Sequence, residues 1–333
     1  MKFQELTEQL KHTQHSWLIT GVAGFIGSNL LEFLLKNNQL VLGVDNFSTG
    51  YQHNLDHVEK GVGSKNWANF EFKEGDIRDS ELLKPYISGE TYVLHQAALG
   101  SVPRSINDPL TTNSVNVDGF LNVLKACSDA KAKAFVYAAS SSTYGDHPDL
   151  PKKEDVTGNP LSPYAVSKLV NELYADVFYR CYGFGSVGLR YFNVFGKRQN
   201  PSGAYAAVIP LWINSAIKGE NIYINGDGTT SRDFCFIENV IQANILAAMR
   251  PKTGSTVYNV AFGEQTSLLR LANLVSQIVD NKNTTIEFRD FRAGDVKHSL
   301  AEITKIKAEL HYKPEYSMLS GLNETIEWYQ SEL

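Results

Sequence analysis

SWLITGVAGFIG, residues 16–27, joins a short apolar run to a G-x-x-G-x-x-G turn, and this turn opens into the helix-compatible stretch Phe25–Lys36. Because they lack a Cβ atom, Gly21 and Gly24 permit a tight turn and a close approach of the backbone to a pyrophosphate, while Gly27 lets the helix pack closely on the strand. The free N–H groups and the positive dipole end of the helix provide an anion site. Glycine-rich turns are common, so the prediction of a dinucleotide site depends on the strand before the turn and the helix after it.

Outward from this turn, the first half of the chain alternates short apolar runs with helical patterns. The runs that predict buried strands are SWLITG, QLVLGVD, FEFKEGD, YVLHQAA, AFVYAAS and GSVGLRYF. The helix-compatible stretches are Phe25–Lys36, Ser80–Tyr86, Pro109–Ala130 and Ser162–Tyr182. Apolar strands separated by helices are typical of a parallel sheet covered on both faces. The sequence therefore predicts an α/β fold with a doubly wound parallel sheet of the Rossmann type.

The pattern changes after about Tyr191, where clusters of Asn, Gly and Pro mix with shorter helical stretches such as Leu268–Val279 and Leu319–Tyr329. We expect residues 1–190 to form the dinucleotide-binding domain, joined by returning segments near 234–262. Residues 191–333 should mainly form a smaller, mixed α/β cap that binds the substrate.

Composition narrows the class of protein. The 333 residues are 43% hydrophobic and 20% charged, with a formal net charge of −5 and no long Lys/Arg run, which disfavours a nucleic-acid partner. No segment predicts a signal peptide or a membrane span, so the expected location is the cytoplasm. Three widely spaced cysteines, Cys127, Cys181 and Cys235, fit neither a disulfide framework nor a metal site.

Two acidic residues follow predicted strands near the glycine turn. Asp45 ends the second strand, near the offset of about 20 residues expected for a carboxylate that binds the adenosine ribose hydroxyls. Because a carboxylate repels a 2′-phosphate, NAD is favoured over NADP. Asp76 follows the third strand, where it either meets the adenine or caps a helix.

Tyr164 and Lys168 form a Y-x-x-x-K pair within SPYAVSKLVNELY, so both side chains project from one face of the predicted helix. The unperturbed pKa of a phenol, about 10, is too high for a base at neutral pH. An adjacent ammonium and an oxidised nicotinamide would stabilise the phenolate, and Tyr164 could then take and return a hydroxyl proton. Such pairs also occur by chance in amphipathic helices, but the preceding Rossmann half favours the catalytic interpretation.

The hydroxyl run from Ser140 to Thr143 ends the fifth strand, at the carboxyl edge where open α/β sheets bind ligands. A hydroxyl there can donate to a substrate oxygen and accept from the tyrosine. We assign the catalytic role to Ser142 and a supporting role to Ser140, the alternative being a polar loop cap.

With these motifs the chain resembles the extended short-chain dehydrogenases/reductases, in their nucleotide-sugar epimerase branch. The resemblance rests on GVAGFIG, GVDNFSTG, GDIRD, HQAA, SSSTYGD, SPYAVSK, LRYFNVFG, NGDGTTSRDF and RAGDV, in this order from Trp17 to about Ser299. Within that branch, the chain is similar to bacterial UDP-N-acetylglucosamine 4-epimerases that serve surface-polysaccharide synthesis.

The resemblance implies further contacts. With Gly21, Gly24, Gly27, Asp45, Asp76, Tyr164 and Lys168, the residues implied around NAD are Phe25, Ile26, Asn46, Ser48, Gly50, Ile77, Gln96, Ala97 and Ala98. Asn193, Arg232 and Arg292 are implied at the diphosphate, where guanidinium groups suit phosphate oxygens. The uracil would be bordered by Tyr205, Ala206, Val208 and Ile209, and the sugar by Gly100, Ser101, Val102, Ser140, Ser141 and Ser142. Asn225, Asp295 and Ser299 complete the implied substrate contacts, whereas His95 is interpreted as a satisfied strand-end residue.

The implied reaction is inversion at C4 of a UDP-N-acetylhexosamine through a 4-keto sugar. Related dehydratases carry an acidic residue where this chain has Ser142, which argues against dehydration. UDP-glucose/galactose and UDP-hexuronates, including N-acetylhexosaminuronates, remain open as substrates, since Arg104 or Lys297 could meet a C6 carboxylate. A non-catalytic NAD-sensing protein is the alternative from another class.

Ser299 stands four residues after Asp295, where similar epimerases limited to non-acetylated hexoses carry a bulky tyrosine. A serine would leave room for a 2-acetamido group; alternatively, Ser299 caps a helix that begins near Leu300. The stretches Pro109–Ala130 and Ser162–Tyr182 also carry surplus apolar faces. In similar proteins two such helices from each subunit form a four-helix bundle, so we expect a homodimer.

Overall fold

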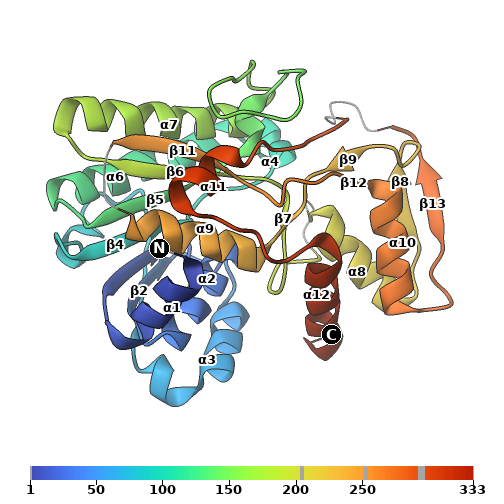
Figure 1. The fold of residues 1–333 in the computed structure, drawn as a ribbon, viewed down its shortest axis with the longest axis horizontal. Coiled ribbons are helices and arrows are strands. Elements are labelled where there is room, and N and C mark those ends of the chain that lie inside the picture. The colour runs from blue at the N-terminus through green and yellow to red at the C-terminus, as the bar shows by residue number, and fades with distance from the viewer. Residues whose placement is uncertain (1, 203–205, 251–253, 292–296, 333) are drawn as a thin grey trace.

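The computed structural model describes residues 2–202, 206–250, 254–291 and 297–332. Its centre is a seven-stranded sheet in the order β3-β2-β1-β4-β5-β6-β11, in which every neighbouring pair is parallel (Figure 1). The strands are β1 (Ser16–Thr20), β2 (Leu40–Asp45), β3 (Phe70–Glu74), β4 (Thr91–His95), β5 (Ala134–Ser140), β6 (Ser186–Tyr191) and β11 (Ser255–Val260). The predicted Rossmann-type fold is confirmed, and all six predicted strands form.

Helices cover both faces of this sheet because alternate strand residues point to opposite sides. In β1, Trp17 and Ile19 pack in one hydrophobic cluster, whereas Leu18 packs in the other. The first cluster contains α1 (Phe3–His12), α2 (Phe25–Lys36), α3 (Gln52–Trp67) and α9 (Ile237–Met249). The second contains α6 (Phe120–Asp129) and α7 (Pro163–Tyr182), and beside them lie α4 (Val102–Asn107) and α5 (Pro109–Asn113).

Two predicted helical stretches differ in detail. Pro109–Ala130 is helical, but a π-helical segment, Ser114–Gly119, separates α5 from α6. Ser80–Tyr86 was expected to be helical and contains only a 3-10 turn, Lys84–Tyr86 (η1). The reason is local: Asp79 accepts the backbone N–H of Glu81 at 2.9 Å, and Pro85 lacks an N–H group, so the segment forms turns instead.

The N-terminal helix α1 is an element that the sequence did not reveal. Leu6 and Leu10 are buried in the first cluster, and the side chain of Gln39 donates to the carbonyls of Leu10 (2.6 Å) and Thr13 (3.1 Å). Helix α1 therefore contributes to the core beside α9.

The remaining elements gather at one end of the sheet, on the right of Figure 1. They are β7 (Val194–Phe195), α8 (Val208–Lys218), β8 (Ile222–Asn225), β9 (Ser231–Arg232), β10 (Cys235–Phe236), β12 (Thr266–Ser267), α10 (Leu268–Val279), β13 (Ile286–Arg289) and α12 (Met318–Glu332); α11 (Thr304–Leu310) returns to pack on β11. Three two-stranded pairs form there: β7 with β10, β8 with β13, and β9 with β12. Among the described residues, no helix is long and apolar enough to cross a bilayer.

Candidate active site

A cleft of about 640 Å³ lies at the carboxyl ends of the central strands, within the size range of cofactor and ligand pockets. The strand order reverses between β1 and β4, and ligands of open α/β sheets bind at such a switch point. The cleft brings together the β1–α2 turn, the loops after β2, β3 and β4, the end of β5 and one face of α7. It is completed by residues between Tyr191 and Asn200 and by Ala206 and Ala207.

The glycine turn at one wall is shaped by close backbone contacts. Gly21 has φ +72°, and a Cβ atom there would lie 2.7 Å from the backbone nitrogen of Ala97. A Cβ atom on Gly27 would lie 2.1 Å from the carbonyl oxygen of Gly21. Helix α2 begins after Gly24 with no side-chain cap and no acidic residue in its first turn. Its positive end therefore faces the cleft at Gly24, Phe25, Ile26 and Gly27 and is free to meet an anion.

Asp45 ends β2 beside this turn and is almost fully buried. Its carboxylate accepts the backbone N–H groups of Ala23 and Phe47, both at 2.9 Å. Burial raises the pKa of Asp45, and these backbone hydrogen bonds oppose the rise. The following loop lines the cleft with Asn46, Ser48 and Gly50. A carboxylate next to a pyrophosphate-binding turn fits the ribose of NAD, so the residues present fit the dinucleotide.

Asp76 and Ile77 also line the cleft, at the β3 side. Arg78 donates to both carboxylate oxygens of Asp76, at 3.0 and 2.7 Å, and Asn46 donates at 2.8 Å. The hydrogen bonds from Arg78 lower the pKa of Asp76 to about 2, against the opposing effect of burial. The helix-cap alternative is wrong, because Asp76 is followed by a turn in which it accepts the N–H of Arg78.

At the end of β4, Gln96, Ala97 and Ala98 line the cleft. The preceding His95 is buried, and its Nδ1 lies 2.7 Å from Oγ1 of Thr20. Burial lowers the pKa of His95 to about 3, so the ring is neutral at physiological pH, in keeping with a satisfied structural role.

Tyr164 and Lys168 lie one turn apart on α7, and both line the cleft. Burial raises the pKa of Tyr164, and a hydrogen bond with Ser140 opposes that rise. Lys168 is buried and donates from Nζ to the carbonyl of Ala138 at 2.8 Å. Burial lowers the pKa of Lys168 to about 8, so it is still largely protonated at neutral pH.

Ser140, Ser141 and Ser142 differ in position although they are consecutive. Ser140, the last residue of β5, lines the cleft and contacts Tyr164. Ser142 lies in the 3-10 turn Ser141–Tyr144 (η3) and bonds to Ser140 through its N–H (3.1 Å) and its hydroxyl (2.9 Å). Among the described residues that line the cleft, Ser140 is the one from this serine run.

Part of the predicted substrate set shares the same cleft: Gly100, Ser101, Asn193 and Ala206 line it, as does Arg104. Ser101 has φ +95° and accepts the N–H of Arg104, which caps α4; Val102 follows as the first residue of that helix. Asn193 donates to the carbonyl of Asp233 at 3.0 Å. Val208 begins α8, Ile209 is buried in the core, and Tyr205 lies outside the described residues.

Arg232 and Ser299 lie at β9, and neither is among the residues that line the cleft. Arg232 donates to the carbonyls of Ser231 (2.9 Å) and Lys297 (3.2 Å), and the N–H of Ser299 donates to the carbonyl of Ser231 (3.1 Å). Ser299 caps no helix, because α11 begins only at Thr304. Asn225 ends β8 opposite Arg289. Arg292 and Asp295 lie outside the described residues.

The sequence missed several cleft residues. Tyr191 ends β6, where its hydroxyl donates to Gln96 at 3.1 Å and accepts from Asn244 at 2.9 Å. Gln199 and Asn200 follow β7 and also line the cleft. The motif LRYFNVFG contains Tyr191, but no pattern within it indicates that this aromatic residue, rather than its neighbours, faces the ligand.

Comparison with known proteins gives a consistent result. Residues 17–261 match the model of the NAD dependent epimerase/dehydratase family. A solved structure of UDP-N-acetylglucosamine 4-epimerase from Methanobrevibacter ruminantium, in complex with UDP-N-acetylmuramic acid, has 36% identity and a TM-score of 0.89, covering 96% of this chain and 100% of that one. The Thermus thermophilus UDP-glucose 4-epimerase complex with NAD has 30% identity and a TM-score of 0.82, covering 96% and 100% of the two chains.

A curated relative, UDP-glucuronate 4-epimerase of Thermodesulfobacterium geofontis, is 35% identical over 324 residues, which are 95% of this chain and 97% of the relative. The family match and these full-length similarities agree with the cleft built around the glycine turn. The chain therefore belongs to the NAD dependent epimerase/dehydratase family, and it is an NAD-dependent enzyme of the isomerase class.

Proposed function

We propose that this NAD-dependent UDP-sugar 4-epimerase acts on UDP-N-acetylhexosamine and interconverts UDP-GlcNAc and UDP-GalNAc. The main support for chemistry at C4 is the pair of hydroxyl groups of Ser140 and Tyr164, which contact each other. Both residues line the same cleft as the glycine turn and Lys168. Arg232 and Asn193, on the segments that border the cap, are our candidates for the diphosphate.

In this proposal, Tyr164 moves the proton of the C4 hydroxyl. As a phenolate it takes that proton while the C4–H bond breaks, and it returns the proton when the bond re-forms on the opposite face of the sugar. The chemistry supplied by bound NAD is the acceptance and return of one hydride, so there is no net redox change. Because burial raises the pKa of Tyr164, the phenolate needs nearby positive charge, which protonated Lys168 and an oxidised nicotinamide would provide. Ser140 would hold the C4 oxygen within reach of Tyr164.

The cleft supports epimerisation over dehydration. Dehydration needs an additional acid near the sugar, beyond the group that acts at C4. Among the described residues that line the cleft, the carboxylates are Asp45 and Asp76, at the ends of β2 and β3. Strand β2 is three positions from β5 in the sheet, about 14 Å at the usual strand spacing, so both carboxylates belong to the cofactor side.

The choice of an N-acetylated sugar rests on Ser299. Its backbone is bonded to Ser231, next to Arg232, and the alternative role as a helix cap is excluded by the start of α11 at Thr304. If this segment borders the sugar, a serine leaves space for a 2-acetamido group where a tyrosine ring would fill it.

UDP-glucuronate is a second candidate, favoured by the position of Arg104. This residue lines the cleft next to Ser101, where a guanidinium could meet a C6 carboxylate. The glucuronate 4-epimerase that is 35% identical to this chain adds weight to this candidate.

The test is a panel of UDP-sugars, including UDP-GlcNAc, UDP-glucose and UDP-glucuronate, with inversion at C4 followed by proton NMR. UDP-GlcNAc should have the highest kcat/KM. Ser299→Tyr should abolish turnover of UDP-GlcNAc and spare that of UDP-glucose, whereas Ser299→Ala should change neither. A folded, NAD-loaded Ser299→Tyr variant that keeps both activities would refute the assignment of Ser299. An absence of turnover on every sugar despite bound NAD would instead favour an NAD-sensing protein.

A further inference from the structure

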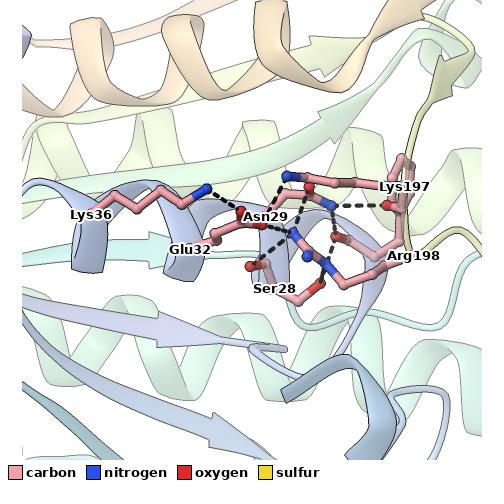
Figure 2. A network of polar contacts seen from close by, with 7 residues as sticks. Ser28, Asn29, Glu32, Lys36, Lys197 and Arg198 are labelled. Carbon is pink, nitrogen blue, oxygen red and sulfur yellow. Dashed lines mark hydrogen bonds and ion pairs between the residues drawn. The ribbon is translucent and has the colours of Figure 1, made fainter. Parts of the chain in front are cut away.

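Helix α2, whose first turn faces the dinucleotide site, carries an unusual buried polar stripe. Ser28, Asn29 and Glu32 are 0%, 1% and 6% exposed, although such groups are costly to bury without partners. Their spacing, i, i+1 and i+4, places them on one side of the helix. They face the segment that follows β7, as Figure 2 shows.

The partner of this stripe is Arg198, a buried residue with φ +66°. Its guanidinium donates to Oγ of Ser28 (3.1 Å), Oδ1 of Asn29 (2.8 Å) and Oε2 of Glu32 (2.6 Å). Lys197 adds an ion pair with Glu32 at 2.9 Å, and its carbonyl accepts from Asn29 at 3.1 Å. Residues 197–198 are thus bound, through backbone and side chains, to the polar stripe of α2 (Figure 2).

Electrostatics make this contact strong. Burial alone would raise the pKa of Glu32, but the charges of Arg198 and Lys197 lower it to about 2. The pair is therefore fully ionised at neutral pH. If residues 197–198 moved away, the buried carboxylate of Glu32 would lose two of its charged partners and keep the half-exposed Lys36, so the contact is expensive to open.

The same segment continues into the wall of the cleft. Gln199 and Asn200 line it, and the side chain of Asn200 donates to the hydroxyl of Tyr51 at 2.6 Å. Tyr51 belongs to the loop after Asp45, and its own N–H is bonded to the carbonyl of Ala23 in the glycine turn. Residues 197–200 therefore run from the polar stripe of α2 to the loop after β2, where we expect the adenosine of NAD.

We propose that Lys197–Asn200 form a strap that retains NAD in its site, and that Arg198 and Glu32 are the latch of this strap. The inference depends on NAD as the cofactor and is independent of the identity of the sugar. NAD can leave only when the strap lifts, so the rate of NAD release should depend on the latch and on the Asn200–Tyr51 contact. Retention suits an enzyme that must return the same hydride to the same sugar.

The experiment measures the release of bound NAD from the purified holoenzyme, without any sugar, by following free nucleotide after rapid desalting. Arg198→Lys, which loses the forked donors, and Arg198→Met should each release NAD at least about tenfold faster. Asn200→Ala, which leaves the buried pair intact, should also release it faster. Lys36→Met is the matched control: Lys36 pairs with the other oxygen of Glu32, at 2.6 Å, but does not touch the strap, so its release rate should equal that of the wild type.

Thermal unfolding of the same variants separates retention from a merely structural role. In the double variant Glu32→Met/Arg198→Met, replacing a buried ion pair by apolar groups should restore stability. NAD release should nevertheless stay fast, because a thioether side chain cannot make the hydrogen bonds by which the guanidinium orients the strap. If Arg198→Lys and Asn200→Ala are folded and release NAD at the wild-type rate, the strap proposal is overturned. Because no sugar is present, a failed epimerase assay would leave this result unaffected.

Discussion

At the scale of single residues, the neighbouring hydroxyls of Ser140 and Ser142 have different surroundings. Ser140 faces the cleft and contacts Tyr164, whereas Ser142 bonds to Ser140 from the 3-10 turn behind it. The geometry thus favours Ser140, rather than Ser142, as the hydroxyl that touches the substrate. We therefore propose that Ser142 is a positioning residue that orients the hydroxyl of Ser140.

We predict that Tyr164→Phe lowers kcat by roughly 10²–10⁴-fold, the usual range for a lost proton transfer, while NAD content and UDP affinity are kept. Ser140→Ala should cost more activity than Ser142→Ala, because only the first removes a group from the cleft. Steady-state kinetics on NAD-loaded enzyme, with UDP binding by calorimetry as control, test both statements. A larger loss for Ser142→Ala would restore Ser142 to the catalytic role.

At the scale of elements, Asp233 joins three segments that are distant in the sequence. It is fully buried between β9 and β10, and its carboxylate accepts the N–H groups of Phe262 (3.2 Å), Gly263 (3.1 Å) and Ala301 (3.2 Å). Burial nevertheless raises the pKa of Asp233 to about 7, because the backbone hydrogen bonds offset only part of the desolvation. Arg232 and Ser299 lie at the same junction, so ionisation of Asp233 should also affect the stability of their surroundings.

The raised pKa of Asp233 gives a pH-dependent prediction. Between its unfolded value, near 4, and about 7, the folded chain holds a proton that the unfolded chain has released, so stability falls as pH rises. His95, whose pKa is lowered to about 3, acts in the opposite direction in part of this range, so the variant must be compared with the wild type at each pH. We compare the free energy of unfolding of Asp233→Asn with that of the wild type. The difference, variant minus wild type, should rise by roughly 2–3 kcal/mol from pH 5 to pH 8, because only the wild type loses this stabilisation. Urea unfolding gives this difference; a constant offset would mean that Asp233 is ionised throughout.

Elements with a strong local signal could be predicted from the sequence. The six predicted strands are apolar runs bounded by turn residues, and Phe25–Lys36 and Leu268–Val279 form helices with those bounds. The small elements at the end of the sheet could not be predicted in detail, since β7, β9, β10 and β12 are two residues long and pair with distant segments.

The site was predictable where spacing alone sets geometry, as for the glycine turn and the pair Tyr164 and Lys168. Four consecutive hydroxyls give no local reason to choose Ser140 over Ser142, because the 3-10 turn decides which of them faces the cleft. Gln199 and Asn200 reach the cleft beside the contact of Arg198 with α2, a pairing about 170 residues apart in the chain that no local pattern indicates.

At the scale of the whole molecule, helix α7 has two different faces: one lines the cleft, and the other is an exposed apolar surface. Tyr164 and Lys168 face the cleft, whereas Val166 and Leu173 lie on the opposite side of the helix and are exposed. Ile106 and Leu110, on the neighbouring α4 and α5, are 60% and 82% exposed. Several exposed apolar side chains on neighbouring helices are typical of a surface that binds a partner protein.

We therefore predict that two copies of the chain pair through α7 and the helical stretch from Pro109, related by a two-fold axis. In such an interface, each substitution appears twice and faces its own copy or its neighbours. Leu173→Arg would bury two cations, so it should convert the dimer into a monomer at micromolar concentration. Leu319→Arg on α12 is the control, since Leu319 is also exposed but lies on the cap. Size-exclusion chromatography with light scattering gives the mass of each species. A wild-type chain that elutes as a monomer at micromolar concentration would leave the apolar face of α7 without this partner and refute the dimer.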